Sequence, residues 1–354
     1  MSAATPPPSL AAIAVAVETR LGELLDAETA RWAAFDDDLA TPLDHIARLV
    51  LGGGKRLRPS FCHWGFVGAG GSADDRRVVD AGAALELMHA FALFHDDVMD
   101  DATSRRGTPT THTVFAEIHA ASGWAGEPRR FGEGVAILVG DLAFVMADQL
   151  MLDAPRDAWV IWNELRTELN IGQLLDIVGS VRGDRRLDKA ERICRYKSGK
   201  YTVERPLHLG AVLAAPERAG ELLPALSAYG LPLGDAFQMR DDVMGAFGDE
   251  SLTGKPVGGD LREGKPTPLL ARAVAAASPS QQTVLADVGS PHLGDGDIAA
   301  MQQVIVDTGA LAALEAQIAA LTDQAVTAIR IAPITEQSRD ELIALAGYVS
   351  RRNV

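Results

Sequence analysis

The chain has 354 residues, with 33 Lys or Arg against 48 Asp or Glu, and a formal net charge of −15 at pH 7. This acidic balance argues against general binding of nucleic acid or of anionic membranes, because both require an excess of cations. A hydrophobic fraction of 47% excludes a disordered chain, and only two cysteines exclude a disulfide framework.

The N-terminal part of the chain is predicted to be helical. A flexible tail over about residues 1–8 is expected to precede the first helix. A second helix is predicted over Pro42 to Leu51, with Thr41 as its cap and Pro42 at its first helical position. Only Gly82 interrupts the stretch from Val78 to Arg106, which predicts one long helix there.

The remainder of the chain continues this helical pattern, since aromatic residues are only 5% and long alternating β-branched runs are missing. Two stretches rich in Gly and charge, 121–134 and 248–268, are predicted as loops, and neither has the length of a linker. We therefore expect one all-α domain over residues 1–354. Further helices are predicted over Val135 to Leu152, Trp159 to Val181, Leu187 to Thr202, Leu233 to Phe247, and after Thr267.

The sequence predicts no secretory signal and no membrane span. The apolar stretch from Leu10 to Val17 has no basic residue before it, which argues against a secretory signal. No apolar run approaches the ~20 residues that span a bilayer. We expect a cytoplasmic protein without a membrane span.

A cluster of carboxylates follows the apolar part of the long predicted helix. Asp96 and Asp100 would lie one helical turn apart, and Asp97 and Asp101 would repeat this relation on the next stripe. Carboxylates this close repel one another unless cations are present, and a hard divalent ion with oxygen ligands would remove that cost. Together with the Arg105–Arg106 pair, the cluster fits a metal-bound phosphate, although a solvated helix end is an equal alternative.

The Asp-Asp-Val-Met sequence of residues 96–99 occurs again at 241–244. Gln238, Asp241 and Asp242 fall within reach of one helix face, and the segment after them carries Lys255 and Lys265, each between Gly and Pro. This second region fits a metal–carboxylate site with a cationic lid, or a polar helix followed by a surface loop. The repeated motif favours a shared site.

Two further groups of cations stand out. GGGKRLRP (52–59) supplies Lys55 and Arg58 for a second phosphate, but it is no P-loop because no Gly-Lys pair in the chain is followed by Ser or Thr. Lys197 and Lys200 are three residues apart on one predicted helix side, where solvated lysines are the ordinary interpretation. Neither a G-x-S-x-G elbow nor an H-E-x-x-H motif is present, which disfavours nucleophilic and zinc hydrolases.

Six motifs in order resemble the trans-isoprenyl diphosphate synthases, also called polyprenyl synthetases, and most of all the actinobacterial geranylgeranyl diphosphate synthases. They are GGGKRLRP (52–59), DDVMD (96–100), RRG (105–107), Gly140-Asp141, KSG (197–199), and the region from FQMRDD to GKPTP (237–268). The resemblance implies a single-domain helical bundle around a deep central cavity, with the two aspartate motifs facing each other across its mouth, and a homodimer. It implies head-to-tail condensation of isopentenyl diphosphate with an allylic diphosphate, giving a C20 or C15 product.

The resemblance also assigns roles to residues of this chain. The catalytic set it implies is Asp96, Asp97, Asp100, Arg105, Lys197 and Asp241. The implied ligands of Mg²⁺ are Asp96, Asp100 and Asp241. The implied contacts to the allylic diphosphate are Arg105, Lys197, Ser198, Gln238, Lys255 and Lys265, and those to isopentenyl diphosphate are Lys55, Arg58, His89 and Arg106.

Two features of the sequence concern how this chain compares with other members of the family: the second aspartate motif and the residues before the first one. Gly245 stands where the second motif usually has a third aspartate. Phe91 and Ala92 occupy the positions that set product length, and one large residue beside a small one is typical of a C20 synthase. Gly245 with the later Asp249 also leaves a class I terpene cyclase as an alternative, and a noncatalytic partner subunit is another.

Overall fold

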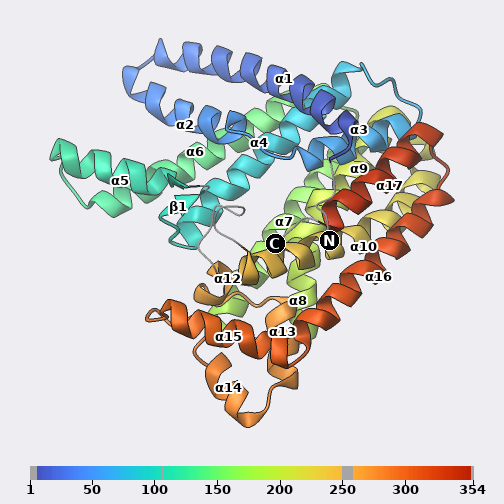
Figure 1. Ribbon diagram of the computed structural model, residues 1–354. Helices are drawn as coiled ribbons and strands as arrows, with labels where there is room; N and C mark the ends of the chain where they lie inside the picture. The colour runs from blue at the N-terminus through green and yellow to red at the C-terminus, as the bar shows by residue number, and fades with distance from the viewer. Residues whose placement is uncertain (1–5, 106, 249–257, 352–354) are drawn as a thin grey trace. The chain divides into compact units, whose positions relative to one another are not determined.

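The computed structural model describes residues 6–105, 107–248 and 258–351 (Figure 1). Among these residues the only strands are β1 (Ser104–Arg105) and β2 (Thr108–Pro109), which pair antiparallel. The predicted all-α class is confirmed. The chain forms two compact units, which we call the N-terminal unit (8–63 and 72–155) and the C-terminal unit (up to 7, 64–71, and from 156 onward). A single domain over residues 1–354 remains a prediction.

The N-terminal unit is built around one helix that is apolar on nearly all sides. Its helices are α1 (Pro8–Ala33), η1 (Asp37–Leu39), α2 (Ala40–Leu51), the first part of α3 (Leu57–Gly68), α4 (Arg76–Met99), α5 (Thr111–Ser122) and α6 (Pro128–Leu150). Helix α4 packs against α6, and Leu85, Leu87 and Met88 on it are fully buried. Asp75 caps its start by accepting from the Arg77 N–H. An all-round apolar helix of this kind belongs in a core.

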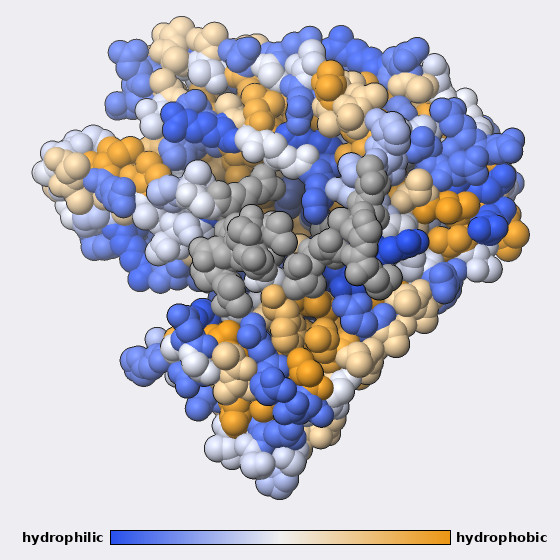
Figure 2. Space-filling model, viewed as in Figure 1, coloured by the Kyte–Doolittle hydropathy of each residue, from blue (hydrophilic) through white to orange (hydrophobic). Residues whose placement is uncertain are grey.

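Helix α4 is also the single described helix that could cross a membrane by length and composition. The bent pair of α15 and α16 passes the same test only when taken together. In α4, 61% of the apolar window is buried inside the protein, which is the behaviour of a core helix. On the face that Figure 2 shows, hydrophilic residues cover most of the surface and apolar residues form separate patches between them.

The C-terminal unit has its core between α10, α13, α15 and α16. Its elements are α7 (Arg156–Arg182), α8 (Leu187–Ile193), the π-helix η2 (Cys194–Glu204), α9 (Arg205–Ala214), η3 (Pro216–Arg218), α10 (Ala219–Phe247), α12 (Gly259–Arg262), α13 (Pro268–Ala276), α14 (Pro279–Leu285), α15 (Asp295–Asp307), α16 (Ala310–Arg330) and α17 (Glu336–Ser350). Figure 1 shows α10 and α16 side by side within it. The buried Tyr229 hydroxyl of α10 donates to the Leu342 carbonyl of α17 at 2.7 Å.

Glycines bring the π-helix η2 close to both of its neighbours. A Cβ added at Gly199 of η2 would lie 2.9 Å from the Gly234 carbonyl carbon of α10. One added at Gly172 of α7 would lie 2.3 Å from the Lys197 backbone nitrogen. Backbone-to-backbone approach at these points is possible only without side chains, and it fixes η2 between α7 and α10.

Several predicted element ends are wrong. Helix α2 begins at Ala40, with Leu39 as its N-cap, so Thr41 lies inside the helix and caps nothing. Helix α4 ends at Met99 rather than Arg106, because carboxylates at a helix C-terminus oppose the helix dipole and Asp101 adopts the left-handed conformation (φ 51°). The predicted loop 121–134 is shorter than expected, covering 123–127 between α5 and α6, because α6 already begins at Pro128, where the Glu127 carboxylate caps it.

The two cysteines are both buried, Cys62 in α3 and Cys194 at the start of η2. Burial raises the pKa of both thiols, so neither forms a thiolate readily near neutral pH. Both therefore act as packing residues.

Candidate active site

The first aspartate cluster lies where α4 ends and continues into β1. The Asp100 N–H donates to the Asp96 carbonyl at 2.8 Å, so these two residues keep the one-turn relation predicted for them. Asp97 is buried, and Arg105 of β1 donates to its carboxylate at 2.8 and 2.6 Å. The same guanidinium lies 3.6 Å from the Asp96 carboxylate. The predicted pairing of Asp97 with Asp101 is therefore wrong, since the left-handed Asp101 leaves the helix.

In this cluster, burial and the contact between Asp97 and Arg105 shift the pKa values of both groups in opposite directions. Burial raises the pKa of Asp97, which the Arg105 guanidinium only partly opposes, and the neighbouring Asp96 raises it further. Burial alone would lower the pKa of Arg105, but its bond to Asp97 and the charges of Asp96 and Asp100 raise it overall. The guanidinium is thus permanently charged beside three carboxylates, at a place where further positive charge would be stabilised.

The cations of the GGGKRLRP motif (52–59), at the start of α3, differ in how deeply they are buried. Arg56 is 4% exposed, pairs with Glu86 at 2.5 Å and with Glu18 at 3.0 Å, and donates to the Val50 carbonyl. It therefore stabilises the fold. Lys55 is exposed, and Arg58 on α3 and His89 on α4 are half-buried, so all three side chains are at least partly accessible to solvent.

The two residues predicted to set product length, Phe91 and Ala92, lie on α4, and the Phe91 ring faces α6. The Phe91 ring lies 4.6 Å from the His95 ring and 4.8 Å from the Phe144 ring of α6, measured between centroids. His95 in turn contacts the Ile137 carbonyl at 3.0 Å. A Cβ at Gly140 would lie 2.5 Å from the His95 ring, which explains the glycine of the Gly140-Asp141 motif.

The second aspartate cluster lies near the end of α10. Asp242 is 4% exposed, and Gln238 donates to its carboxylate at 2.9 Å. Burial raises the pKa of Asp242 well above its usual value, and the carboxylates of Asp260, Asp241 and Asp176 add to this rise. A buried carboxyl surrounded by other carboxyls is stabilised by any cation that binds among them.

Asp260 of α12 is a candidate residue that the sequence analysis missed. A Cβ at Gly245 would lie 2.0 Å from an Asp260 carboxylate oxygen, so the Asp260 side chain fills the space where a third aspartate of the second motif would begin. The Lys265 ammonium lies 3.8 Å from Asp260 and pairs with Glu263. Two features of the sequence could have indicated Asp260. It is an acid that follows Gly-Gly within the second aspartate-rich region, and the third acid usual in that motif is missing at Gly245.

The two lysines of η2 both reach toward α7, and neither is solvated as the ordinary interpretation expects. Lys197 pairs with Asp176 of α7 at 2.5 Å. Lys200 pairs with Glu168, about two turns earlier on α7, and lies 3.5 Å from Glu204. Lys197 consequently lies near the second aspartate cluster through Asp176, with Ser198 half-buried beside it.

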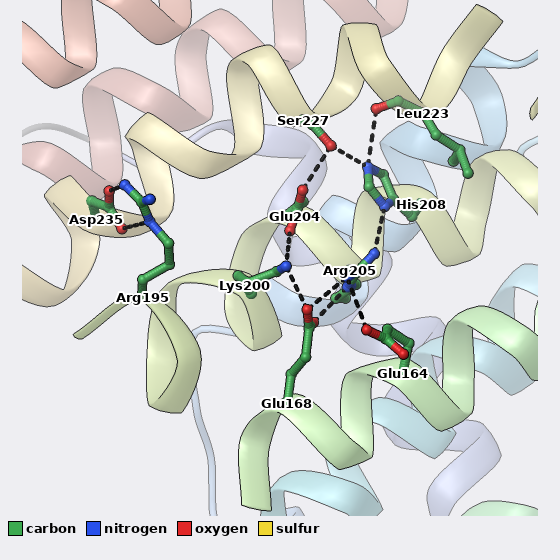
Figure 3. Close-up of polar contacts among 10 residues, drawn as sticks. All are labelled: Glu164, Glu168, Arg195, Lys200, Glu204, Arg205, His208, Leu223, Ser227 and Asp235. Atoms are coloured by element: carbon green, nitrogen blue, oxygen red, sulfur yellow. Dashed lines mark hydrogen bonds and ion pairs between the residues drawn. The ribbon is translucent and has the colours of Figure 1, made fainter. Parts of the chain in front are cut away.

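Lys200 belongs to a buried network that Figure 3 shows among α7, η2, α9 and α10. Arg205 donates to both Glu168 oxygens at 2.6 and 2.7 Å. The Ser227 hydroxyl lies 2.6 Å from a Glu204 oxygen and 3.0 Å from His208 Nε2. Although burial opposes it, hydrogen bonding from Arg205 and Lys200 lowers the pKa of Glu168, so its carboxylate is fully charged near neutral pH.

The same network contains the residue types of a hydrolase triad without its connections. Burial lowers the pKa of His208 to about 4, so the imidazole is neutral at pH 7. Its Nδ1 faces the Arg205 guanidinium at 3.3 Å rather than a carboxylate. Since Glu204 contacts Ser227 instead of His208, the histidine cannot be held as a general base for this serine.

Three residues named from the sequence, Arg106, Asp249 and Lys255, lie outside the described residues. Within the described ranges, no three Asp, Glu, His or Cys side chains gather closely enough to hold a metal by themselves. Asp96, Asp97, Asp100 and Arg105 come together in the N-terminal unit. Lys197, Gln238, Asp241, Asp242 and Lys265 belong to the C-terminal unit, with Asp176 and Asp260 added by the structure.

Comparison with known proteins gives consistent matches. The polyprenyl synthetase family model matches residues 38–305. Geranylfarnesyl diphosphate synthase of Aeropyrum pernix is 30% identical over 86% of this chain and 92% of that protein, and (2E,6E)-farnesyl diphosphate synthase of Mycobacterium tuberculosis is 30% identical over 84% and 80%. The crystal structure of geranylgeranyl pyrophosphate synthase from Corynebacterium glutamicum, complexed with isoprenyl diphosphate and magnesium, is 36% identical, covers 97% of this chain and 99% of that one, and has a TM-score of 0.90.

Proposed function

Since the chain belongs to the polyprenyl synthetase family and is a prenyltransferase of the trans-isoprenyl diphosphate synthase type, we propose that it condenses isopentenyl diphosphate head-to-tail with an allylic diphosphate. The observation that carries this proposal is the pair of aspartate clusters, in each of which burial and neighbouring carboxylates raise the pKa of one aspartate, Asp97 or Asp242, and a cation lies close by. Such an arrangement suits a highly charged anion bound through divalent metal.

The residues present fit Mg²⁺, which we propose as the cofactor. Mg²⁺ is usually bound by one or two carboxylates, with substrate phosphate oxygens and water completing its shell. Among the described residues no three metal-binding side chains gather, so substrate oxygens and water would complete the coordination shell of a bound Mg²⁺. Asp96 and Asp100 would hold metal in the N-terminal unit, and Asp241 would do so in the C-terminal unit. Bound Mg²⁺ would neutralise the allylic diphosphate and so favour its departure.

The remaining chemistry depends on positioning by the protein. Arg105, Lys197, Gln238 and Lys265, with Ser198 and Lys255, would bind oxygens of the allylic diphosphate. When the C–O bond breaks, the allylic carbocation is attacked by the alkene of isopentenyl diphosphate. A new C–C bond forms and the released proton passes to the departed diphosphate. No side-chain nucleophile is needed, because proximity and charge stabilisation supply the catalysis.

Isopentenyl diphosphate is proposed to bind through cations rather than metal. Lys55 and Arg58 would supply these cations, since both are partly accessible, whereas the neighbouring Arg56 is buried and paired with Glu86 and Glu18. His89 would add a hydrogen bond, and Arg106 a further positive charge. These residues also separate the proposal from a class I terpene cyclase, which has no second diphosphate to bind.

The decisive experiment incubates purified protein with Mg²⁺, isopentenyl diphosphate and dimethylallyl diphosphate. A C20 or C15 prenyl diphosphate is expected by chromatography. A parallel reaction with geranylgeranyl diphosphate alone should give no hydrocarbon, whereas a cyclase would release one. Complete inactivity with every allylic primer would instead favour a noncatalytic partner subunit.

Asp241 is proposed as the main metal ligand of the second motif. Replacing Asp241 with Ala should lower kcat/KM about 100-fold at limiting Mg²⁺, because a single well-placed electrostatic contact in a transition state contributes this much. Initial rates over a Mg²⁺ titration measure the effect. Full turnover by D241A at low Mg²⁺ would contradict the assignment.

Product length is proposed to depend on Phe91. Replacing Phe91 with Ala removes one ring from the group formed with His95 and Phe144, and the product should lengthen beyond that of the wild type. Thin-layer or liquid chromatography of the dephosphorylated products checks this. The control is F144L, which also thins the ring group but lies on α6. An unchanged product from F91A would exclude Phe91 as the limit.

We further propose a cytoplasmic homodimer. Helix α6 exposes Leu138, Leu142 and Val145 along one stripe, at 63%, 38% and 55%. Helix α7 similarly exposes Ile171, Leu174 and Val181. Regularly spaced apolar residues on a helix surface suit a second copy of the chain. Sedimentation of the wild type should give a dimer, and V145K should shift it toward the monomer.

A further inference from the structure

Lys265 lies in a turn whose backbone is held by residues distant in the sequence. Arg185, in the segment between α7 and α8, donates from Nη1 to the Gly264 carbonyl at 2.8 Å. Its Nη2 lies 3.5 Å from the Val288 carbonyl. One guanidinium thus joins the residue immediately before Lys265 to the segment after α14.

The residue after Lys265 is held as well. A Cβ added at Gly179, near the end of α7, would lie 3.3 Å from the Pro266 side chain. Gly264 has a φ of 69°, and a Cβ on it would lie 2.9 Å from the Gly289 Cα. The end of α7 and the segment that follows it therefore fix Lys265 from both sides.

The charge on Arg185 has no carboxylate partner among the described residues, in which its hydrogen bonds go to carbonyls alone. Burial lowers the pKa of this guanidinium, as expected for a charge that is partly removed from water. Arg182, the last residue of α7, lies about one turn earlier and is exposed. Both arginines line a cavity of about 550 Å³ together with Glu263 and Gln282.

We propose that Arg185 is a positioning residue for Lys265, fixing the Gly264 carbonyl so that the lysine is presented to a diphosphate. The proposal rests on the proposed function, in which Lys265 binds the allylic diphosphate. Arg185 touches no substrate in this role. Its planar fork of donors suits two carbonyls, which a lysine ammonium cannot bridge in the same way.

The first test measures binding and kinetics of R185A, R185K and R182A. R185A should raise the KM for the allylic diphosphate and the Kd for inorganic pyrophosphate with Mg²⁺ about tenfold, in line with loss of a hydrogen bond from a charged group. The KM for isopentenyl diphosphate should not change. R185K should be intermediate, and R182A should match the wild type. Combining R185A with K265A should be no worse than K265A alone.

The second test is chemical rescue. Removing the Arg185 side chain enlarges a cavity that has room for a guanidinium ion. Guanidinium chloride at low millimolar concentration should restore pyrophosphate binding to R185A by at least threefold, while NaCl at equal ionic strength should not. Rescue of this kind is not expected if the arginine merely contributes to folding stability.

Failure of the proposal and failure of the proposed function give different results. A wild-type protein that binds Mg²⁺-pyrophosphate but forms no prenyl product would overturn the function. Unchanged pyrophosphate binding by R185A, an equal rise in both substrate KM values, or additive effects of R185A and K265A would each overturn the positioning role.

Discussion

Two buried groups of carboxylates in the C-terminal unit have opposite electrostatics. In the network of Figure 3, Glu168 contacts the cations of both Lys200 and Arg205, and its pKa is lowered despite burial. In the second aspartate cluster, burial raises the pKa of Asp242 and the surrounding carboxylates raise it further, against which the hydrogen bond from the Gln238 amide acts only in part. Burial is similar in the two cases, at 6% and 4% exposure, but the charge balance differs.

The comparison distinguishes supporting structure from a binding site. A buried acid that is already paired with cations has its charge neutralised and does not attract a further cation. Removing one partner of such a pair leaves an uncompensated buried charge. Buried acids that repel one another make the folded protein less stable until a cation arrives. Charge imbalance, rather than the number of acids, therefore distinguishes the cluster at which we propose metal binding from the paired network.

The largest effect is expected for Glu168. Replacing Glu168 with Gln removes the partner of two buried cations and should lower the free energy of unfolding by about 3–5 kcal/mol at pH 7. Denaturant unfolding measures this. The matched control is Glu164, which lies on the same helix, contacts the same Arg205 at 3.8 Å and is 53% exposed. E164Q should cost about 0–1 kcal/mol.

The difference in unfolding free energy between the wild type and E168Q should depend on pH, because the pKa of Glu168 is lowered in the folded protein. A carboxyl with a lowered folded-state pKa stabilises the protein above its unfolded value, here 4.5, and this stabilisation is lost as the pH falls through the folded value. The gap between the wild type and E168Q should narrow below about pH 4.5. A gap that is constant from pH 7 to pH 3 would show that charge pairing is not its cause.

The next effect concerns Gly245. Introducing the family's usual aspartate as G245D would collide with Asp260, and we expect about a 100-fold loss of kcat/KM at limiting Mg²⁺. The double variant G245D/D260A returns a single carboxylate to this space and should recover at least tenfold over G245D. A double variant worse than both single ones would show that Asp260 does not substitute for the missing acid.

The smallest effect is expected for Asp242. A raised folded-state pKa means that this carboxyl stabilises the protein below its unfolded value of 3.8, and that the stabilisation is lost as the pH rises through the folded value. Without Mg²⁺, D242N should therefore gain on the order of 1 kcal/mol at pH 7 and gain nothing below pH 3.8. Loss of stability in D242N at pH 7 would place Asp242 with the matched network.

Sequence predicts the long helices well and their ends poorly. Helix α7 occupies 156–182 against a prediction of 159–181, because its length makes the helical pattern clear. Helix α10 begins at Ala219 rather than Leu233, since Pro224 and Pro232 resemble breakers but lie inside the helix. Burial of Pro232 and Leu233 in the core outweighs the local cost of proline.

The site residues follow the same division. Residues that are close in sequence, such as Asp96 and Asp97 or, one helical turn apart, Gln238 and Asp242, are visible as motifs. Asp260 is not, because its relation to Gly245 exists only after α12 packs against α10. The ion pairs of Lys197 and Lys200 with acids of α7 were equally hidden, since nothing in local sequence shows that η2 packs against α7.

The burial of both cysteines makes the native chain a ready template for site-specific labelling. Cys62 and Cys194 have little thiolate near neutral pH and are enclosed, so thiol reagents should leave them unmodified. A cysteine introduced at Leu138 would then be the sole reactive sulfur on each subunit. A spin label or pyrene attached there would report directly, through its partner label, whether two copies meet along α6.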